Sequence, residues 1–165
     1  MPVEIRTMKR DDWGRIRDIY LEGIATGHAT FETDSPDWET WDTRHLNAPR
    51  LVAVRGADLV GWAALSPVSL RRVYRGVAEV SVYVAEASRG DGVGQLLLEA
   101  LVRESERCEI WTLQASIFPE NEGSISLHQK CGFREVGVRK QIGQLNGVWR
   151  DTVLLERRSE AVGTT

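Results

Sequence analysis

The sequence predicts an α+β domain in which hairpin-linked strands form a sheet and helices are inserted between them. Three observations support this class. Strand-like runs alternate or are uniformly apolar, helix-like segments repeat apolar residues every three or four positions, and Gly-containing turns separate neighbouring strands. Along the chain the order is strand, two helices, three strands, helix, strand, helix and two strands. This order differs from the strict alternation of a doubly wound fold.

The first half begins with an alternating strand at Val3–Met8, followed by a helix that Asp11 or Asp12 could cap. The apolar residues on one face of this helix are Ile16, Ile19, Tyr20 and Ile24. After a loop at 27–34, Ser35-Pro36 predicts the start of a second helix, because serine caps helices and proline suits their first turn. The apolar runs that follow, at 51–55 and 59–65, flank a Gly-Ala-Asp turn and predict a hairpin.

The second half is expected to contain strands at 77–84 and 111–118, with a helix from about Val93 to Cys108 between them. The buried stripe expected on this helix comprises Val93, Leu97, Ala100, Leu101 and Cys108. Asn121 is placed to cap a helix that ends at Cys131, with Gly132 following it, and we expect both cysteines to be buried thiols. An Asn-Gly turn at 146–147 predicts a final hairpin.

The composition narrows the function classes. The 165 residues suit one domain, and 42% hydrophobic residues can form a core. With 21 basic and 24 acidic residues and no block of like charge, binding to nucleic acid is not indicated. No apolar run approaches the roughly 20 residues that span a bilayer, and the N-terminus lacks an apolar leader, so we expect a cytoplasmic protein. The two cysteines and three histidines lack metal-ligand spacing, which predicts a metal-free protein.

A glycine-rich loop, Arg89-Gly90-Asp91-Gly92-Val93-Gly94, joins a strand to a helix and predicts a phosphate or diphosphate cradle. Amides at a helix N-terminus have no intrahelical partners, and glycines let an anion approach them. A Walker loop would need Lys-Ser/Thr after Gly94, and a dinucleotide fingerprint would need glycine at Gln95. The Walker loop and the dinucleotide fingerprint are therefore both excluded. For this segment alone, a plain glycine-rich turn that binds no ligand remains an equally weighted alternative.

Two motifs together resemble the GNAT (GCN5-related N-acetyltransferase) superfamily. The R-x-x-G-x-G pattern at 89–94 is similar to its acetyl-CoA diphosphate motif, and N-E-G-S-I-S-L-H-Q-K-C-G-F at 121–133 is similar to its N-x-x-x-x-x-L-Y-x-K-x-G-F signature. The departure is His128, where most members have tyrosine. Segments across nearly the whole chain resemble the phosphinothricin / methionine sulfoximine N-acetyltransferase group, which has histidine at this position. These segments are ATGHATFETDSP, RRVYRGVAEVSVYV, SIFPENEGSISLHQKCGF and NGVWRDTVLLERR.

The resemblance implies a fold and an activity. The fold is a mixed, mostly antiparallel twisted sheet of about seven strands flanked by about four helices, in one domain over 1–158 with a C-terminal tail at 159–165. The implied activity is direct transfer of acetyl from acetyl-CoA to the α-amino group of a small amino-acid-like substrate in a ternary complex. The group is often dimeric, so a homodimer is expected.

The resemblance also implies binding residues. The acetyl-CoA contacts expected from it are Val82, Tyr83, Val84, Arg89, Gly90, Asp91, Gly92, Val93, Gly94, Gln95 and Asn121. The substrate contacts expected from it and from the clustered guanidinium groups are Phe31, Ser69, Leu70, Arg71, Arg72, Tyr74, Arg75, Glu79, Val80 and Ser81. A basic surface loop is the alternative explanation for the arginines. Helix capping alone would explain Asn121.

Glu79 and His128 are the candidate catalytic residues. A carboxylate in an otherwise apolar strand is costly unless it is paired or faces a cleft, so Glu79 is expected to act as the base; a solvated strand face or a structural ion pair with a nearby arginine is the alternative. His128 could protonate the departing thiolate or help to take a proton from the amine, although a lone histidine beside an apolar stripe is also a common core residue. Acetylation of a protein N-terminus and non-catalytic acyl-CoA sensing are the competing functions.

Overall fold

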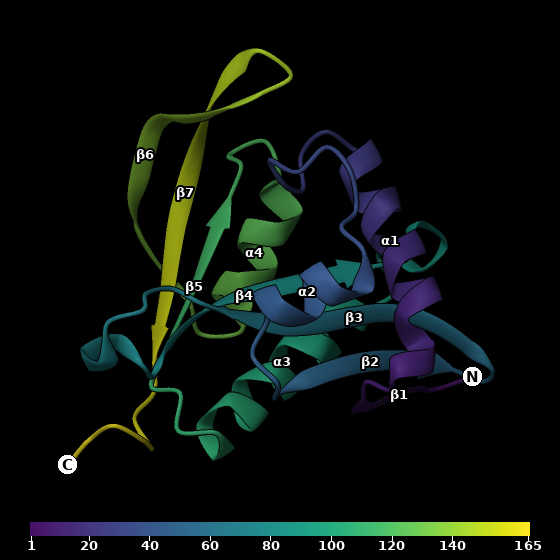
Figure 1. Ribbon diagram of the computed structural model, residues 1–165, viewed down its shortest axis with the longest axis horizontal. Helices are drawn as coiled ribbons and strands as arrows, with labels where there is room; N and C mark the ends of the chain where they lie inside the picture. Colours follow the sequence, from purple (N-terminus) through teal and green to yellow (C-terminus); the bar gives the residue numbers. More distant parts are fainter.

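The computed structural model describes all 165 residues and confirms the α+β class, with one seven-stranded sheet and four helices (Figure 1). The strands are β1 (Val3–Thr7), β2 (Arg50–Arg55), β3 (Asp58–Pro67), β4 (Val77–Val84), β5 (Thr112–Ile117), β6 (Arg134–Leu145) and β7 (Val148–Arg158). The helices are α1 (Trp13–Ala25), α2 (Trp38–Arg44), α3 (Val93–Arg107) and α4 (Glu122–Lys130), with short 3-10 turns η1 (Arg10–Asp12), η2 (Arg72–Tyr74) and η3 (Glu86–Ser88). No helix is long and apolar enough to span a membrane.

The sheet changes direction in its middle. The strand order is β1-β2-β3-β4-β5-β7-β6, and every neighbouring pair is antiparallel except β4 and β5, which are parallel. These two strands pair only at Val77, Ala78 and Glu79 on β4, opposite Thr112, Leu113 and Gln114 on β5. Beyond Glu79, β4 continues to Val84 and β5 to Ile117 without pairing to each other. The sheet therefore splays open between its two halves.

Helices cover both faces of the sheet. On one face, α3 contributes Leu97 and Leu101 to a core of 20 buried residues shared with the central strands. On the other face, α1 contributes Ile16 and Ile19 to a second core that contains Trp41 of α2. Alternation along β4 explains the division, because its even-numbered residues face the α3 core and its odd-numbered ones face the other way.

The expected helix starts are partly wrong. The helix predicted from Ser35-Pro36 begins instead at Trp38, where the Asp37 side chain accepts a hydrogen bond of 2.8 Å from the Thr40 amide. Ser35 fails as a cap because its hydroxyl donates to the Pro36 carbonyl. Asp12 precedes α1 without capping it, since its carboxylate binds Arg6 and the Lys9 amide.

Two burial expectations are also wrong. Cys108 is exposed and Cys131 is only partly buried, because each lies at the C-terminal end of a helix rather than within its apolar stripe. The turn chemistry is confirmed. Asn146 and Gly147 both have positive φ, 51° and 80°, as a tight hairpin between β6 and β7 requires, and Gly132 has a φ of 93° just after α4.

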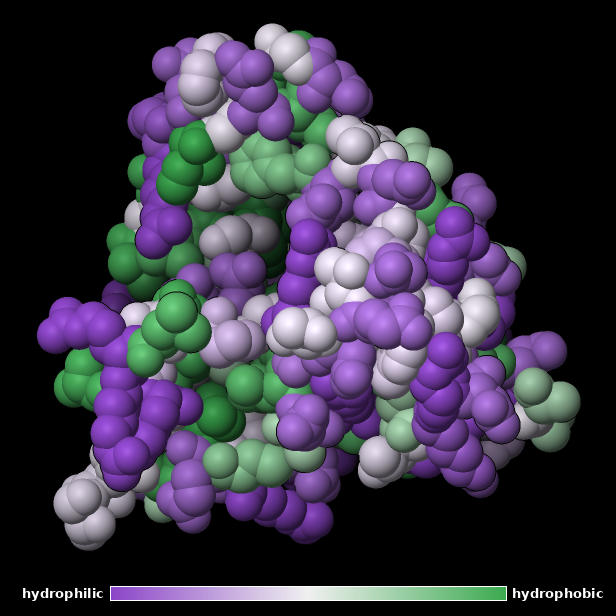
Figure 2. All heavy atoms as spheres, in the orientation of Figure 1, coloured by the Kyte–Doolittle hydropathy of each residue, from purple (hydrophilic) through white to green (hydrophobic).

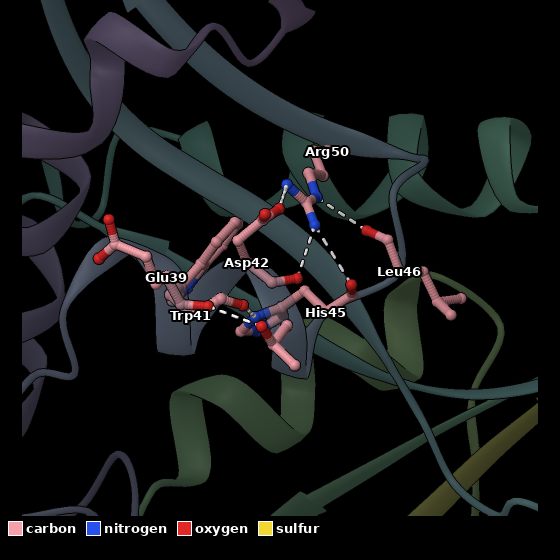
Figure 3. Close-up of polar contacts among 7 residues, drawn as sticks. Glu39, Trp41, Asp42, His45, Leu46 and Arg50 are labelled. Carbon is pink, nitrogen blue, oxygen red and sulfur yellow. Dashed lines mark hydrogen bonds and ion pairs between the residues drawn. The ribbon is translucent and has the colours of Figure 1, made fainter.

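Arg50 ties the end of α2 to β2 (Figure 3). Its guanidinium donates to the Asp42 carboxylate at 2.6 Å and to the carbonyls of Asp42, His45 and Leu46 at 2.8 to 3.2 Å. These carbonyls lie where a helix end leaves acceptors without partners. His45, stacked on Trp41, is partly buried beside this clamp, and this burial lowers the pKa of its imidazole. One arginine thus satisfies the carboxyl end of a seven-residue helix that could not persist alone.

Replacing Arg50 with methionine is expected to lower the free energy of unfolding by about 2 kcal/mol, because hydrogen bonds from a charged donor are lost and carbonyls lose their partner. Urea denaturation followed by tryptophan fluorescence measures the change. Arg44→Met is the matched control, since Arg44 is exposed on the same helix. Equal stability of the two variants would show that the clamp contributes nothing.

Candidate active site

The splay between β4 and β5 forms a cleft of about 570 Å³. In Figure 2 the surface is hollowed between the β6–β7 hairpin and the helices α1 and α2. The structure places in the lining the following residues expected from sequence: Phe31, Glu79, Val80, Ser81, Val82, Tyr83, Val84, Arg89, Gly94, Asn121 and His128. Residues from both halves of the chain therefore meet at the one place where the sheet is open.

The glycine loop forms a backbone cradle beside this cleft. Gly90 and Gly92 have φ of 85° and 83°, and no atom lies within 4 Å of the position that a Cβ would take at either residue. Gly92 precedes α3 without a side-chain cap, so the amides of the first turn keep their donors free. Open space over unpartnered amides and the Arg89 guanidinium fits the diphosphate of acetyl-CoA.

Three loop side chains turn away from this cradle. Asp91 lies 3.5 Å from Arg55, the Gln95 side chain donates to Glu99, and Val93 is buried in the core. The loop thus offers a ligand its backbone, with Arg89 as the side chain that lines the cleft.

Glu79 lies at the last paired position before the strands separate. Its Oε1 accepts a hydrogen bond of 3.1 Å from Gln114 Nε2 and one of 3.4 Å from the Ser116 hydroxyl. No cation pairs with it, so the ion-pair alternative is not what the structure shows. The carboxylate is partly exposed and is oriented by two neutral donors from β5, which leaves it able to accept a proton from a ligand in the cleft.

His128, on α4, belongs to the lining of the cleft and is only 4% exposed. Its Nδ1 lies 2.7 Å from the Ser124 carbonyl, and because a carbonyl can only accept, Nδ1 carries the proton. Burial lowers the pKa of this imidazole, which keeps it neutral near pH 7. In that state Nε2 is an acceptor.

The side chains of Tyr83 and Asn121 both make contacts that stabilise the fold. Tyr83 stacks on Trp62 with ring centroids 4.9 Å apart, and burial together with Tyr20 raises the pKa of its phenol. The Asn121 Oδ1 accepts from the Ser124 amide at 3.3 Å, which confirms the expected cap, and its Nδ2 donates to the His28 carbonyl at 3.2 Å.

The arginine-rich loop does not line the cleft. Ser69, Leu70, Arg71, Arg72, Tyr74 and Arg75 all lie outside the cavity wall. Leu70 is fully exposed, Arg71 lies over Tyr74, and Arg75 lies over Trp111. The loop joins β3 to β4 and ends at Gly76, three residues before Glu79.

Several lining residues that the sequence did not indicate lie on two irregular segments and on β7. These are Thr26, His28, Ala29 and Thr30 after α1, and Phe118, Glu120 and Thr152 from the β5–α4 loop and β7. The Phe31 and Phe118 rings meet edge to face at 4.8 Å and form an apolar wall. No periodicity marks these residues; the Ala-Thr-Gly-His-Ala-Thr-Phe stretch that carries part of the resemblance was the signal available.

Comparisons with known proteins agree with this geometry. Residues 12–133 match the model of the acetyltransferase (GNAT) family. The chain is 36% identical over 167 residues to the phosphinothricin N-acetyltransferase of Alcaligenes faecalis, covering 98% of this chain and 85% of that protein.

Two solved structures have nearly the same fold. A GNAT superfamily phosphinothricin acetyltransferase from Sinorhizobium meliloti, in complex with acetyl-CoA, superimposes with a TM-score of 0.89 at 29% identity, covering 100% of this chain and 92% of that one. A ribosomal-protein-alanine N-acetyltransferase from Brucella melitensis superimposes with a TM-score of 0.87 at 32% identity, covering 94% and 99%.

Replacing Gly92 with alanine is expected to raise the KM for acetyl-CoA about tenfold, because an L-residue at positive φ costs about 1–2 kcal/mol and the loop would shift to avoid it. Initial rates at varied acetyl-CoA measure this. Gly14→Ala, in open space on α1, is the control and should leave KM unchanged. An unchanged KM for Gly92→Ala would show that the loop does not hold the diphosphate.

Proposed function

The chain belongs to the acetyltransferase (GNAT) family, and from that premise we propose that it acetylates the α-amino group of a small amino acid analogue of the phosphinothricin or methionine sulfoximine type, by direct transfer within a ternary complex. The activity class is N-acetyl transfer, with acetyl-CoA as cosubstrate. The observation that carries the substrate proposal is the cleft itself. The Glu79 carboxylate, held by neutral hydrogen-bond donors, lies there together with the apolar wall of Phe31 and Phe118 and beside the glycine loop that we propose binds the diphosphate.

The open edge of β4 provides the track for the pantetheine arm. The β3-facing edge of this strand is paired along its length, whereas its β5-facing edge is paired only as far as Glu79. Backbone groups of Val82, Tyr83 and Val84 on that edge can therefore bond a ligand as an added strand would. When bound, acetyl-CoA supplies an activated thioester carbonyl.

Glu79 is the proposed base. An amine arrives as an ammonium ion and must lose a proton before its nitrogen can attack a carbonyl. Gln114 and Ser116 hold one carboxylate oxygen, which fixes the direction in which Glu79 receives the proton, either directly or through water.

His128 is proposed as a neutral acceptor rather than as the acid. With its proton on Nδ1 and its pKa lowered, Nε2 can accept a hydrogen bond or relay a proton from the amine side. Donation to a thiolate would first require protonation of a buried imidazole.

The arginine loop is proposed to contact the anionic end of the substrate. Because it lies outside the cleft wall, this contact requires the loop to fold inward from the outer end of β4 when substrate binds. Guanidinium groups match carboxylate and phosphinate geometry.

Glu79→Gln is expected to lower kcat/KM at neutral pH by about 100-fold, because positioned general bases contribute factors of that order. The loss should shrink as pH rises, since a growing fraction of the amine is then already deprotonated. Thiol release from acetyl-CoA measures turnover on methionine sulfoximine, phosphinothricin, polyamines and a peptide beginning with alanine. Glu135→Gln, at an exposed position on β6, is the control.

The same panel separates the competing functions. Preference for the peptide would favour protein N-terminal acetylation, the activity named for the Brucella melitensis structure. Saturable acetyl-CoA binding without turnover of any amine would favour an acyl-CoA sensor and refute the enzyme proposal.

We also propose that the protein is a homodimer formed through β6. This 12-residue strand is the free outer edge of the sheet (Figure 1), and it exposes apolar side chains at Val136, Val138 and Ile142. A long, unpaired, apolar edge invites pairing, and a two-fold axis lets the same edge of a second copy pair with it.

Sedimentation equilibrium is expected to give twice the chain mass of 18.5 kDa for the wild type and the chain mass for Val138→Glu, because a charge there would be desolvated at the interface. Leu96→Glu, an exposed apolar position on α3, is the matched control and should stay dimeric. A monomeric wild type at micromolar concentration would contradict the proposal.

A further inference from the structure

Arg150, on β7, joins segments that lie far apart in the sequence. Its side chain is only 13% exposed. One guanidinium nitrogen donates to the Gly27 carbonyl at 3.1 Å, and the other donates to the Glu120 carboxylate at 3.2 Å and to His28 Nδ1 at 3.1 Å. The same guanidinium lies 4.0 Å from the centre of the Phe118 ring. One side chain thus connects the segment after α1 with the segment after β5.

Both segments line the cleft. Thr26 and His28 to Phe31 line it after α1, and Ser116 to Phe118 with Glu120 line it at the end of β5 and just beyond. A second bond, from Asn121 Nδ2 to the His28 carbonyl, joins the same two segments. Thr26 and Gly27 donate to the carbonyls of Gly23 and Ile24 at the end of α1, but residues 28–31 lie in no helix or strand, so their position depends on such contacts.

The position of Phe31 follows from this connection. Its ring packs edge to face on Phe118 and against Gly143, where an added Cβ would come within 3.1 Å of the ring. Arg150 stacks on Phe118 and holds the backbone four residues before Phe31, so it fixes both rings of the apolar wall. The charge is matched locally, because Glu120 lies beside the guanidinium and the Glu120 pKa is lowered, in part by Arg150.

We propose that Arg150 is a positioning residue that determines amine selectivity, by latching residues 27–31 across the cleft and so setting the space beside Phe31 and Phe118. The proposal rests on the function proposed above. Arg150 does not line the cleft and touches no reacting atom; it acts through the wall. With the latch intact, the pocket is narrow and suits a short amino acid. With the latch broken, Phe31 is free to move, and a small amine loses its apolar contact.

The test compares Arg150→Met, which keeps the apolar stem without the donors, with Arg150→Lys, which keeps the charge. Arg103→Met, at an exposed position on α3, is the matched control. We expect Arg150→Met to raise the KM for the preferred amino acid about tenfold with the KM for acetyl-CoA unchanged, Arg150→Lys to restore part of the loss, and the control to match wild type. Circular dichroism and thermal melting verify that each variant folds.

Hydrogen–deuterium exchange of the amides at 26–31 tests the latch without turnover. We expect exchange there to accelerate about tenfold in Arg150→Met and to stay unchanged in the control. Unchanged exchange would overturn the latch. Accelerated exchange with an unchanged amine KM, or with both KM values raised alike, would overturn the role in selectivity. If the wild type acetylates no amine, the proposed function fails by itself, and the exchange experiment alone decides the latch.

Discussion

The short parallel pairing of β4 with β5 is the constraint on which the rest of the molecule depends. Only three residue pairs join these strands, and past Glu79 they diverge. Elsewhere the strands of the sheet pair with their neighbours over five or more residues. The divergence leaves one edge of β4 with free backbone groups inside the protein, which would be costly unless a ligand or water satisfied them. The cleft is thus a consequence of sheet topology.

Each element around the cleft is placed by a contact that also satisfies a structural need. Asn121 caps α4 and at the same time bonds the segment after α1. Arg50 satisfies the end of α2, which packs its Trp41 into the core beneath the α1 face. The neutral state of His128 comes from burial and from the Ser124 carbonyl one turn earlier on its own helix. The arrangement of the cleft and the stability of the fold therefore rest in part on the same bonds.

The charged side chains at the cleft differ in the partners that hold them. The glycine loop presents backbone amides beside the Arg89 guanidinium, and the Glu79 carboxylate is held by neutral amide and hydroxyl donors. No ion pair involves Glu79, whereas Glu120, which also lines the cleft, pairs with Arg150. A carboxylate held like that of Glu79 can still receive a proton.

Local patterns in the sequence were sufficient for most elements of the fold. Hydrophobic residues repeating every two positions located the strands, those repeating every 3.6 positions located the helices, and Asn146-Gly147 located the last hairpin. These signals can be recognised in the sequence because each depends only on residues a few positions apart. They failed where side chains had competing partners, as at Ser35 and Asp12. The motifs at 89–94 and 121–133 were sufficient to identify the family, because each lies within a short stretch of the chain.

What only the tertiary structure decided is how distant segments meet. No local pattern shows that the loop after α1 touches β7, because 123 residues separate Gly27 from Arg150. The burial that lowers the pKa of His128 arises only in the folded chain, and the place of the arginine loop outside the cleft depends on the path of the chain between β3 and β4. The sequence by itself determined the fold class and the family, whereas the three-dimensional packing determined which residues line the cleft and which contacts hold them there. The physical reason is that long-range contacts arise from the folded chain as a whole, whereas propensity and turn chemistry act locally.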